Sequence, residues 1–195
     1  MDNIIQSDNI LLHSCCGPCA EWPVQVLSQE GYQLTLYYGN PNIHPTMEWE
    51  RRKDALKKFA DLKNLPLHIE PRFEQAYWES EAWKDTYSSR CEMCYAMRMD
   101  MAAETAAQMG FSAFTTTLLV SIYQDHEAII KAAQRAAEKH KVQFLYRDFR
   151  EGFRKGQDMA REDGLYRQKF CGCIFSLEES KFKDKIYRSF EGSDG

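Results

Sequence analysis

Cysteines are the residues best able to do chemistry in this chain, and all seven lie in three short clusters. In a reducing compartment, cysteines grouped this tightly are metal ligands or redox catalysts more often than structural disulfides. Seven independent apolar side chains would not gather in this way. The clusters are Cys15, Cys16 and Cys19 in S-C-C-G-P-C, Cys91 and Cys94 in C-E-M-C, and Cys171 and Cys173 in C-G-C.

The spacing within the clusters favours metal binding. On a helix, Cys91 and Cys94 would share one face with Cβ atoms roughly 5–6 Å apart, so both thiolates could bind one metal group. Gly172 frees the backbone between Cys171 and Cys173, which suits a loop that bridges two metals. A four-cysteine zinc site would leave three thiols unused. We therefore expect four thiolates on a [4Fe-4S] cluster and three on a second, mononuclear metal with an open position.

Two other classes of protein remain open. C-G-P-C is also the dithiol of thioredoxin-like oxidoreductases, which would use Cys16 and Cys19 alone. Here that motif follows the first predicted strand, and the other cysteines would have no role. A zinc-binding, RNA-associated module without redox activity is the second alternative.

Composition predicts one domain over residues 1–195. The N-terminus lacks the features of a signal peptide, and no apolar run reaches eighteen residues, so we expect a cytoplasmic protein without a membrane partner. The net charge of −4 does not indicate a nucleic-acid binder. However, residues 147–188 carry 11 Lys and Arg against 8 Asp and Glu, which allows a local basic surface.

Short apolar runs alternate with longer segments of helical period. This alternation predicts an α/β fold, a Rossmann-like parallel sheet with helices on both faces. One helical segment is expected to bury Trp49, Phe59 and Leu62 and to expose charged residues that include Arg52. The pattern ends after residue 146, so the cysteine-rich C-terminal tail is expected to wrap over the site. The predicted strands are 10–13, 33–38, 66–69, 112–116 and 142–146, and the predicted helices are 20–29, 46–63, 90–109 and 124–140.

Polar or reactive segments follow four of these strands. The cysteine triplet follows the first strand, residues 40–45 the second, residues 115–117 end the fourth, and residues 147–150 follow the fifth. Ligands of such folds bind beyond the carboxyl ends of the strands. We therefore expect one site at that edge of the sheet.

Several motifs together carry a resemblance to a known family. They are 13–19 (H-S-C-C-G-P-C), 38–45 (Y-G-N-P-N-I-H-P), 91–95 (C-E-M-C-Y) with Arg98, 114–121 (F-T-T-T-L-L-V-S), 148–150 (D-F-R) and 165–173 (L-Y-R-Q-K-F-C-G-C). With these motifs in this order, the sequence resembles the QueH-type epoxyqueuosine reductases, a cobalamin-independent family, over residues 11–177. The resemblance implies a fold like that of the adenine-nucleotide hydrolase superfamily. Because the triplet stands where related tRNA-thiolating enzymes carry their phosphate loop, ATP binding is not expected.

The resemblance also implies an activity and its partners. Epoxyqueuosine at the wobble position of a tRNA anticodon loop would lose its epoxide oxygen, with electrons from an unidentified low-potential donor. All seven cysteines are expected to bind metal, and iron is the expected second, mononuclear metal ion. The expected catalytic residues are Cys15, Cys19, Cys173 and His44; the cluster ligands include Cys15, Cys16, Cys91, Cys94 and Cys171; and the substrate contacts are Asn40, Asn42, Tyr95, Arg98, Asp148, Arg150, Arg167 and Gln168.

Several side chains could have a structural role instead of a functional one. His44 could be scaffolding in a turn instead of a proton donor, and Tyr95 and Arg98 could serve packing and surface charge. Residues 125–127 (D-H-E) are expected to cap a helix and not to bind metal. Trp78, Trp83 and Tyr87, in a segment predicted to be irregular, are candidates for base stacking or for the core.

Overall fold

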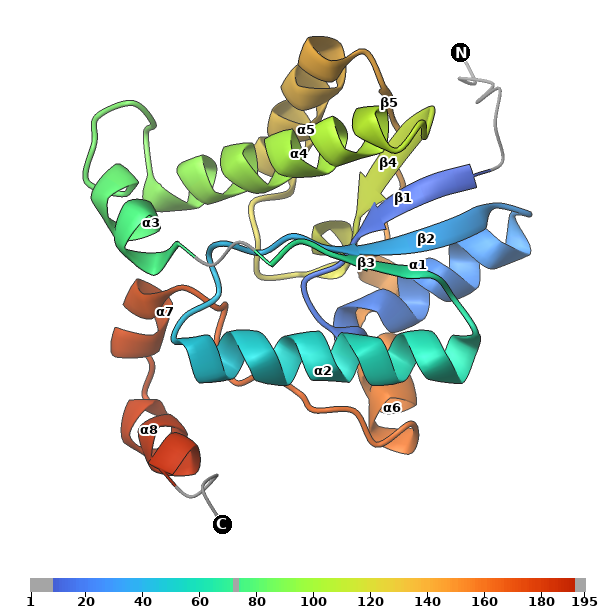
Figure 1. Ribbon diagram of the computed structural model, residues 1–195. Helices are drawn as coiled ribbons and strands as arrows, with labels where there is room; N and C mark the ends of the chain where they lie inside the picture. Colours follow the sequence, from blue (N-terminus) through green and yellow to red (C-terminus); the bar gives the residue numbers. More distant parts are fainter. Residues whose placement is uncertain (1–8, 72–73, 192–195) are drawn as a thin grey trace.

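A five-stranded parallel sheet forms the centre of the protein (Figure 1). The computed structural model describes residues 9–71 and 74–191. Strand order is β3-β2-β1-β4-β5, so the chain moves outward on one side of β1 and then crosses to the other. The strands are β1 (Asn9–His13), β2 (Gln33–Tyr38), β3 (Leu67–Ile69), β4 (Ala113–Thr116) and β5 (Gln143–Phe144).

Strand β1 lies at the middle of the sheet because its apolar run is buried on both faces. Ile10, Leu11 and Leu12 have no exposed surface. The register places His13 beside Tyr37 of β2 and Thr116 of β4, so three strands end at the same edge. The strand order changes direction at β1, which places a topological switch point there.

Helices cover both faces of the sheet, which confirms the predicted fold class. In Figure 1, α4 and α5 lie on one face, and α1, α2 and α6 lie on the other. None of the helices within the described ranges has the length and apolar character needed to span a bilayer. The helices are α1 (Gly17–Gln29), α2 (Thr46–Lys63), α3 (Gln75–Glu81), α4 (Arg90–Gln108), α5 (His126–His140), α6 (Phe153–Glu162), α7 (Ile174–Glu178) and α8 (Lys183–Glu191), with short 3₁₀ turns η1 (Thr117–Val120) and η2 (Arg150–Gly152).

Helix α1 begins three residues earlier than predicted, inside the cysteine motif itself. Cys16 is its N-cap and Pro18 lies in the first turn, where a missing N–H costs nothing. A Cβ on Gly17 would lie 2.7 Å from the Ala55 carbonyl oxygen of α2. The glycine therefore lets the two helices approach closely and holds the cysteines at the sheet edge.

The prediction that regular structure ends after residue 146 was wrong. The segment contains α6, α7 and α8, and α3 occupies part of the stretch before Cys91 that was expected to be irregular. Helix α6 escaped prediction because it buries only Gly156 and Ala160, two small residues that give no apolar period. The small residues allow close packing of α6 on α1, where the Trp22 side chain lies over Gly156.

Helix α2 has the predicted bounds, but two of its residues lie on the opposite side from that expected. Trp49 and Phe59 are buried as predicted. Leu62 is 52% exposed, and Arg52 is 1% exposed. Arg52 is buried because it has a full set of partners, which sequence periodicity does not reveal.

Candidate metal centre and its pocket

The cysteine triplet is a compact, buried set of thiols after β1. The Sγ atoms of Cys15, Cys16 and Cys19 all lie within 4.8 Å of one another, and Cys15 and Cys16 are 3.7 Å apart at sulfur. Thr117 donates its hydroxyl to the Cys15 sulfur at 3.6 Å. Cys16 is the N-cap of α1 and Cys19 lies in its first turn, where the helix dipole favours thiolates.

The other four cysteines are contributed by α4 and by the segment before α7. Cys91 and Cys94 lie in the first two turns of α4, as their spacing predicted. Cys94 and Cys173 pack in one buried cluster with Trp78 and Met93. Burial raises the pKa of Cys94 to about 12, and the charge of Cys171 and Cys173 adds to this effect. Both pairs therefore lie close to each other.

The protonation of the triplet shows why a metal suits it. Hydrogen bonds with the other two thiols hold the pKa of Cys15 well below its usual value. Burial raises the pKa of Cys16 well above its usual value, and the hydrogen bond to Cys15 raises that of Cys19. Three thiolates at this separation repel one another in a buried site unless a cation neutralises them. The donor set thus fits a thiophilic metal.

Arg98 of α4 supplies a fixed positive charge between the cysteine clusters. It is 2% exposed and donates from Nη2 to Asn40 Oδ1 at 2.8 Å. Asn40 in turn donates to the Ser14 carbonyl at 2.9 Å, which orients the guanidinium. Burial opposes its charge, but the neighbouring Cys94, Cys15 and Cys171 thiols raise the pKa of Arg98 above its ordinary value.

A cavity of about 320 Å³ opens onto these sulfurs. Its wall includes Cys15, Cys19 and Cys171, so thiols from the first and third clusters face the same space. Gln168 donates from Nε2 to the Cys19 sulfur at 3.4 Å, and Gln124 lies 3.9 Å from the Cys171 sulfur. Buried polar atoms without a partner among the described residues line this wall: Asn42 Oδ1, Gln124 Oε1, Gln168 Oε1 and Arg98 Nε. The cavity therefore combines metal ligands with polar groups that could bind a substrate. We call it the cysteine pocket.

The C-terminal segment is held over the sheet edge by a buried ion pair. Arg52 contacts Glu48 at 2.7 Å and donates to the carbonyls of Phe170 and Cys171, each at 2.9 Å. The Tyr166 hydroxyl donates to the other Glu48 oxygen at 2.7 Å. These bonds fix the segment that carries Cys171 and Cys173, and a cysteine-rich tail over the site was the expected arrangement.

His44 lies behind this segment and does not line the cysteine pocket. Its Nδ1 accepts the Ile174 N–H at 3.2 Å, and its Nε2 lies 3.0 Å from the Pro41 carbonyl. Burial lowers the pKa of His44 to about 4. A neutral ring with both nitrogens bonded to backbone favours the scaffolding alternative over proton donation.

The remaining predicted substrate residues separate into two groups. Asn42, Arg98 and Gln168 line the cysteine pocket, and Asn40 supports Arg98. Tyr95, Asp148, Arg150 and Arg167 do not line it. Asp148 and Arg150 pair with each other at the surface, with Oδ1 to Nε at 2.9 Å.

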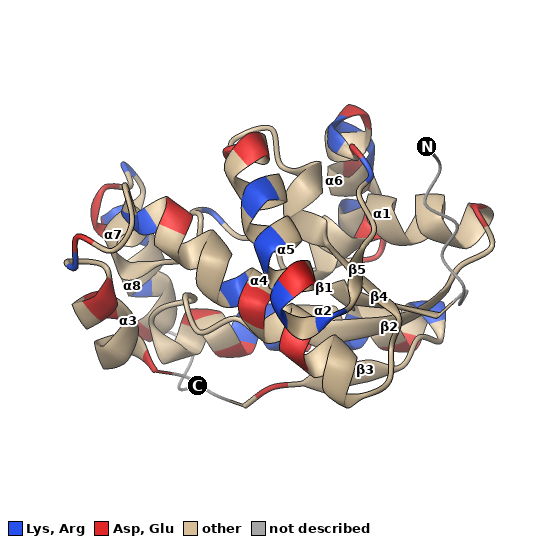
Figure 2. Ribbon diagram, turned by 90° about the horizontal axis from the view of Figure 1, so that it is seen from above, with Lys and Arg blue, Asp and Glu red and all other residues tan. Residues whose placement is uncertain are grey.

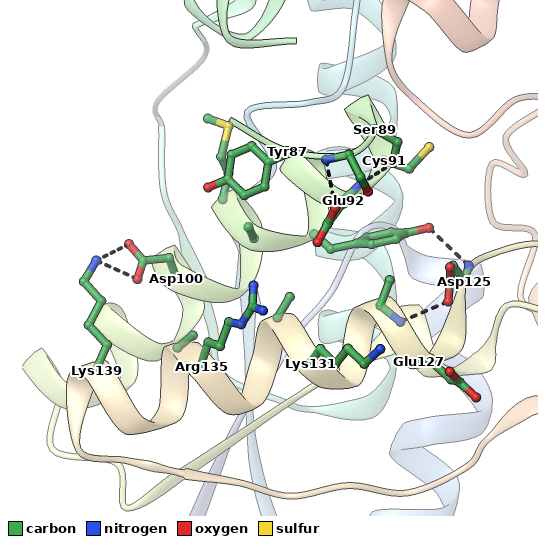
Figure 3. Close-up of a pocket in the computed structure, with 17 residues that line it drawn as sticks. Tyr87, Ser89, Cys91, Glu92, Asp100, Asp125, Glu127, Lys131, Arg135 and Lys139 are labelled. Atoms are coloured by element: carbon green, nitrogen blue, oxygen red, sulfur yellow. Dashed lines mark hydrogen bonds and ion pairs between the residues drawn. The ribbon is translucent and has the colours of Figure 1, made fainter. Parts of the chain in front are cut away.

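A second hollow lies between α4 and α5 (Figure 3). It measures about 530 Å³, and of the cysteines only Cys91 lines it. Tyr87 and Tyr95 line it as well, and the Tyr95 hydroxyl accepts the Asp125 N–H at 3.3 Å (Figure 3). Asp125 caps α5 by accepting the Ala128 N–H at 3.0 Å, which confirms the capping prediction.

The predicted stacking aromatics lie away from the cysteine pocket. Trp78 is 1% exposed and belongs to the core, whereas Trp83 is 77% exposed and packs on Phe175. The sequence prediction missed Arg52, Gln124 and Tyr123. The 114–121 motif was a signal for the last two, because the loop that follows β4 must lie at the same sheet edge.

Comparison with known proteins agrees with this arrangement. A family model described as epoxyqueuosine reductase QueH matches residues 10–179. The chain belongs to the QueH family. The epoxyqueuosine reductase QueH of Haemophilus influenzae is 34% identical over 190 residues, covering 93% of this chain and 77% of its own. The QueH proteins of Dehalococcoides mccartyi and Thermotoga maritima are each 31% identical, covering 87% and 89% of this chain and 93% of their own.

Among solved structures, the likeness extends to the fold alone. A deacetylase in complex with teicoplanin aligns with a TM-score of 0.51 and 12% identity, over 80% of this chain and 86% of that chain. The same kind of enzyme in a second complex aligns with a TM-score of 0.50 and 13% identity, covering 80% and 83%. These matches agree with the Rossmann-like sheet of this QueH chain.

Proposed function

We propose that this chain reduces epoxyqueuosine to queuosine at the wobble position of tRNA. Membership of the QueH family supports the reaction, and the cysteine pocket supports its location. The single observation that carries the proposal is a cavity in which thiols from separate clusters, a buried cation and carboxamides meet.

We assign the seven thiols to two metal groups. Cys91, Cys94, Cys171 and Cys173 would hold a [4Fe-4S] cluster, and Cys15, Cys16 and Cys19 would hold a second metal ion, iron being the proposed one. The short sulfur separations in the triplet support one ion there, and the mutual effect of the other four thiols on their pKa values supports a second group. When bound, these groups supply electrons and a Lewis acid.

The reaction breaks both bonds from the ring carbons to the epoxide oxygen and forms an alkene. Two electrons enter from an external low-potential donor, and two protons leave with the oxygen as water. The chain binds and orients the substrate: Asn42 and Gln168 offer amide groups to its polar atoms, and Arg98 stabilises negative charge as electrons enter. The buried wall excludes bulk water from the reacting oxygen.

The RNA must present an extruded nucleotide to this pocket. A cavity of about 320 Å³ admits one modified base and not a paired stem. The partner is therefore a single-stranded anticodon loop, recognised by stacking and phosphate contacts. We place this enzyme in the cytoplasm, where tRNA and reduced thiols coexist.

The test is anaerobic purification followed by metal analysis and turnover. We expect about five irons and four acid-labile sulfides per chain, and queuosine in tRNA after addition of a chemical reductant. Zinc with little iron, or a reversible Cys16–Cys19 disulfide without metal, would contradict the proposal. A Cys94→Ser variant should lose sulfide and iron together, whereas Cys19→Ser should lose about one iron and keep the sulfide.

A further inference from the structure

Tyr123 is an exposed aromatic side chain at the mouth of the cysteine pocket. It is 82% exposed, the highest value among the large apolar side chains of the described residues that stand out at the surface. It lines the same cavity as Cys15, Cys19 and Cys171. An aromatic ring left in water beside a reaction pocket needs a reason, because burying it would stabilise the fold.

The ring is held in place from several sides. Phe153 of α6 contacts it edge to face, with ring centroids 5.6 Å apart. The Tyr123 N–H donates to Ser121 Oγ at 3.2 Å. Two residues further on, the Asp125 N–H donates to the Tyr95 hydroxyl at 3.3 Å. The loop is thus anchored on both sides of Tyr123, and the ring is preorganised for a contact.

The charge around the mouth suits an RNA strand. Lys169 and Tyr123 both line the cysteine pocket. Among the residues that the structure describes, neither Lys169 nor Arg167, two positions earlier in the chain, has an ion-pair partner, whereas Arg150 pairs with Asp148. An aromatic face next to unpaired cations is the combination that single-stranded nucleic acids bind.

We propose that Tyr123 stacks on the base adjacent to the wobble nucleotide while that nucleotide occupies the cysteine pocket. The inference rests on the proposed function and deepens it, since it names the second nucleotide that the enzyme contacts. Extrusion of the wobble base leaves its neighbour without a stacking partner. A rigid aromatic ring at the rim replaces that partner and offsets part of the cost of extrusion.

Trp83 provides a matched control. It is nearly as exposed, at 77%, but it packs on Phe175 and does not line the cysteine pocket. If exposed aromatics bound RNA without regard to position, both residues would contribute. If the pocket mouth determines binding, only Tyr123 should.

The experiment compares wild-type protein with Tyr123→Ala, Tyr123→Phe and Trp83→Ala, all loaded anaerobically to equal metal content. Binding is measured with an anticodon stem-loop carrying 2-aminopurine on either side of the wobble position, whose fluorescence falls on stacking. We expect Tyr123→Ala to raise the Kd about 5- to 100-fold and to abolish the fall in fluorescence. Tyr123→Phe and Trp83→Ala should stay within about twofold of wild type.

The outcomes separate this inference from the proposed function. An unchanged Kd in Tyr123→Ala, or equal losses in both alanine variants, would overturn the stacking contact. Loss of queuosine formation with the chemical reductant in Tyr123→Ala, at an unchanged Kd, would assign the ring to a step after binding and also overturn the stacking contact. A wild-type protein that binds the RNA and quenches the probe but never forms queuosine would disprove the proposed function alone.

Discussion

Arg98 is the residue whose placement says most about the chemistry. The Arg98 guanidinium is 2% exposed, so it has lost most of its hydrating water. Asn40 and the thiols of Cys15, Cys94 and Cys171 interact with its charge instead. Such a charge is costly unless negative groups face it. A reduced metal centre carries one more negative charge than an oxidised one. Arg98 should therefore stabilise the reduced state.

We predict that Arg98→Gln lowers the midpoint potential of the centre. Glutamine keeps a hydrogen bond to Asn40 and removes the positive charge, so the shift should be on the order of 50 mV or more. Redox titration followed by electron paramagnetic resonance measures it. Arg98→Lys should restore most of the potential, and Arg135→Gln, in the hollow between α4 and α5, should leave it unchanged. An unaltered potential at full metal content in Arg98→Gln would contradict this role.

Individual residues differ in how far the sequence could place them. The cysteines stood out from spacing alone, because thiols scattered by chance would not form three tight clusters. Arg52 did not, since its burial depends on Glu48 one turn earlier and on carbonyls of residues 170 and 171, more than a hundred positions away. Tyr123 could not be placed from the sequence either, because its position at the pocket mouth depends on the fold and not on its residue type.

The elements α1, α2 and α6 meet at a buried carboxyl group, Glu21. Its side chain is fully buried, 3.5 Å from Lys63 of α2, and Lys63 also binds Asp163 at the end of α6 at 2.7 Å. Burial, with a smaller effect of Asp163, raises the pKa of Glu21 from 4.5 to about 7, although Lys63 opposes the change. A group that holds its proton more tightly in the folded state stabilises the fold below its unfolded pKa. That stability is lost as pH rises through about 7.

We predict that Glu21→Gln stabilises the protein at pH 8 and has little effect at pH 4.5. The amide removes the cost of a buried carboxylate, about 3 kcal/mol at high pH, and leaves the Lys63–Asp163 pair in place. Anaerobic thermal unfolding of metal-loaded protein at the two pH values measures the difference. Glu162→Gln, an exposed change on α6, serves as the control. Equal stabilisation at both pH values would exclude the ionisation of Glu21 as the cause.

At the scale of secondary-structure elements, the sequence predicted the strands of the sheet better than the helices that cover it. The strands follow from short apolar runs, and α2, α4 and α5 from long amphipathic ones, within about two residues. Helix α6 was missed because contact with α1 requires small residues, and Gly156 carries no hydrophobic signal. The start of α1 was missed because the Gly and Pro of C-G-P-C are typical of a turn. In the structure Cys16 is the N-cap, and Gly17 and Pro18 are the first residues of the helix.

The whole molecule carries a net charge of −4, yet its proposed substrate is a polyanion. Figure 2 shows Lys and Arg interspersed with Asp and Glu over the helices. Within residues 147–188, four of the eleven cations have an ion-pair partner, among them Arg150 with Asp148 and Arg161 with Asp158. Of the seven cations without an ion-pair partner among the described residues, Lys169 lines the cysteine pocket, and Arg154 and Arg167 are next in the chain to residues that line it. These three are therefore the cations best placed to bind phosphates at the pocket.

We predict a weak dependence of RNA binding on salt, and we expect it to originate near the cysteine pocket. Three phosphate contacts to a single strand give a slope of about −2 for log K against log salt concentration. Lys169→Ala and Arg167→Ala should each reduce the slope by about 0.7, because each removes one contact. The slope is measured by titrating an anticodon stem-loop at several salt concentrations. Lys185→Ala, on α8 and outside the cysteine pocket, should leave the slope unchanged. If both substitutions left the slope unchanged, the RNA would have to bind another face of the protein. Because the net charge is −4, a basic surface on that other face would also have to be small.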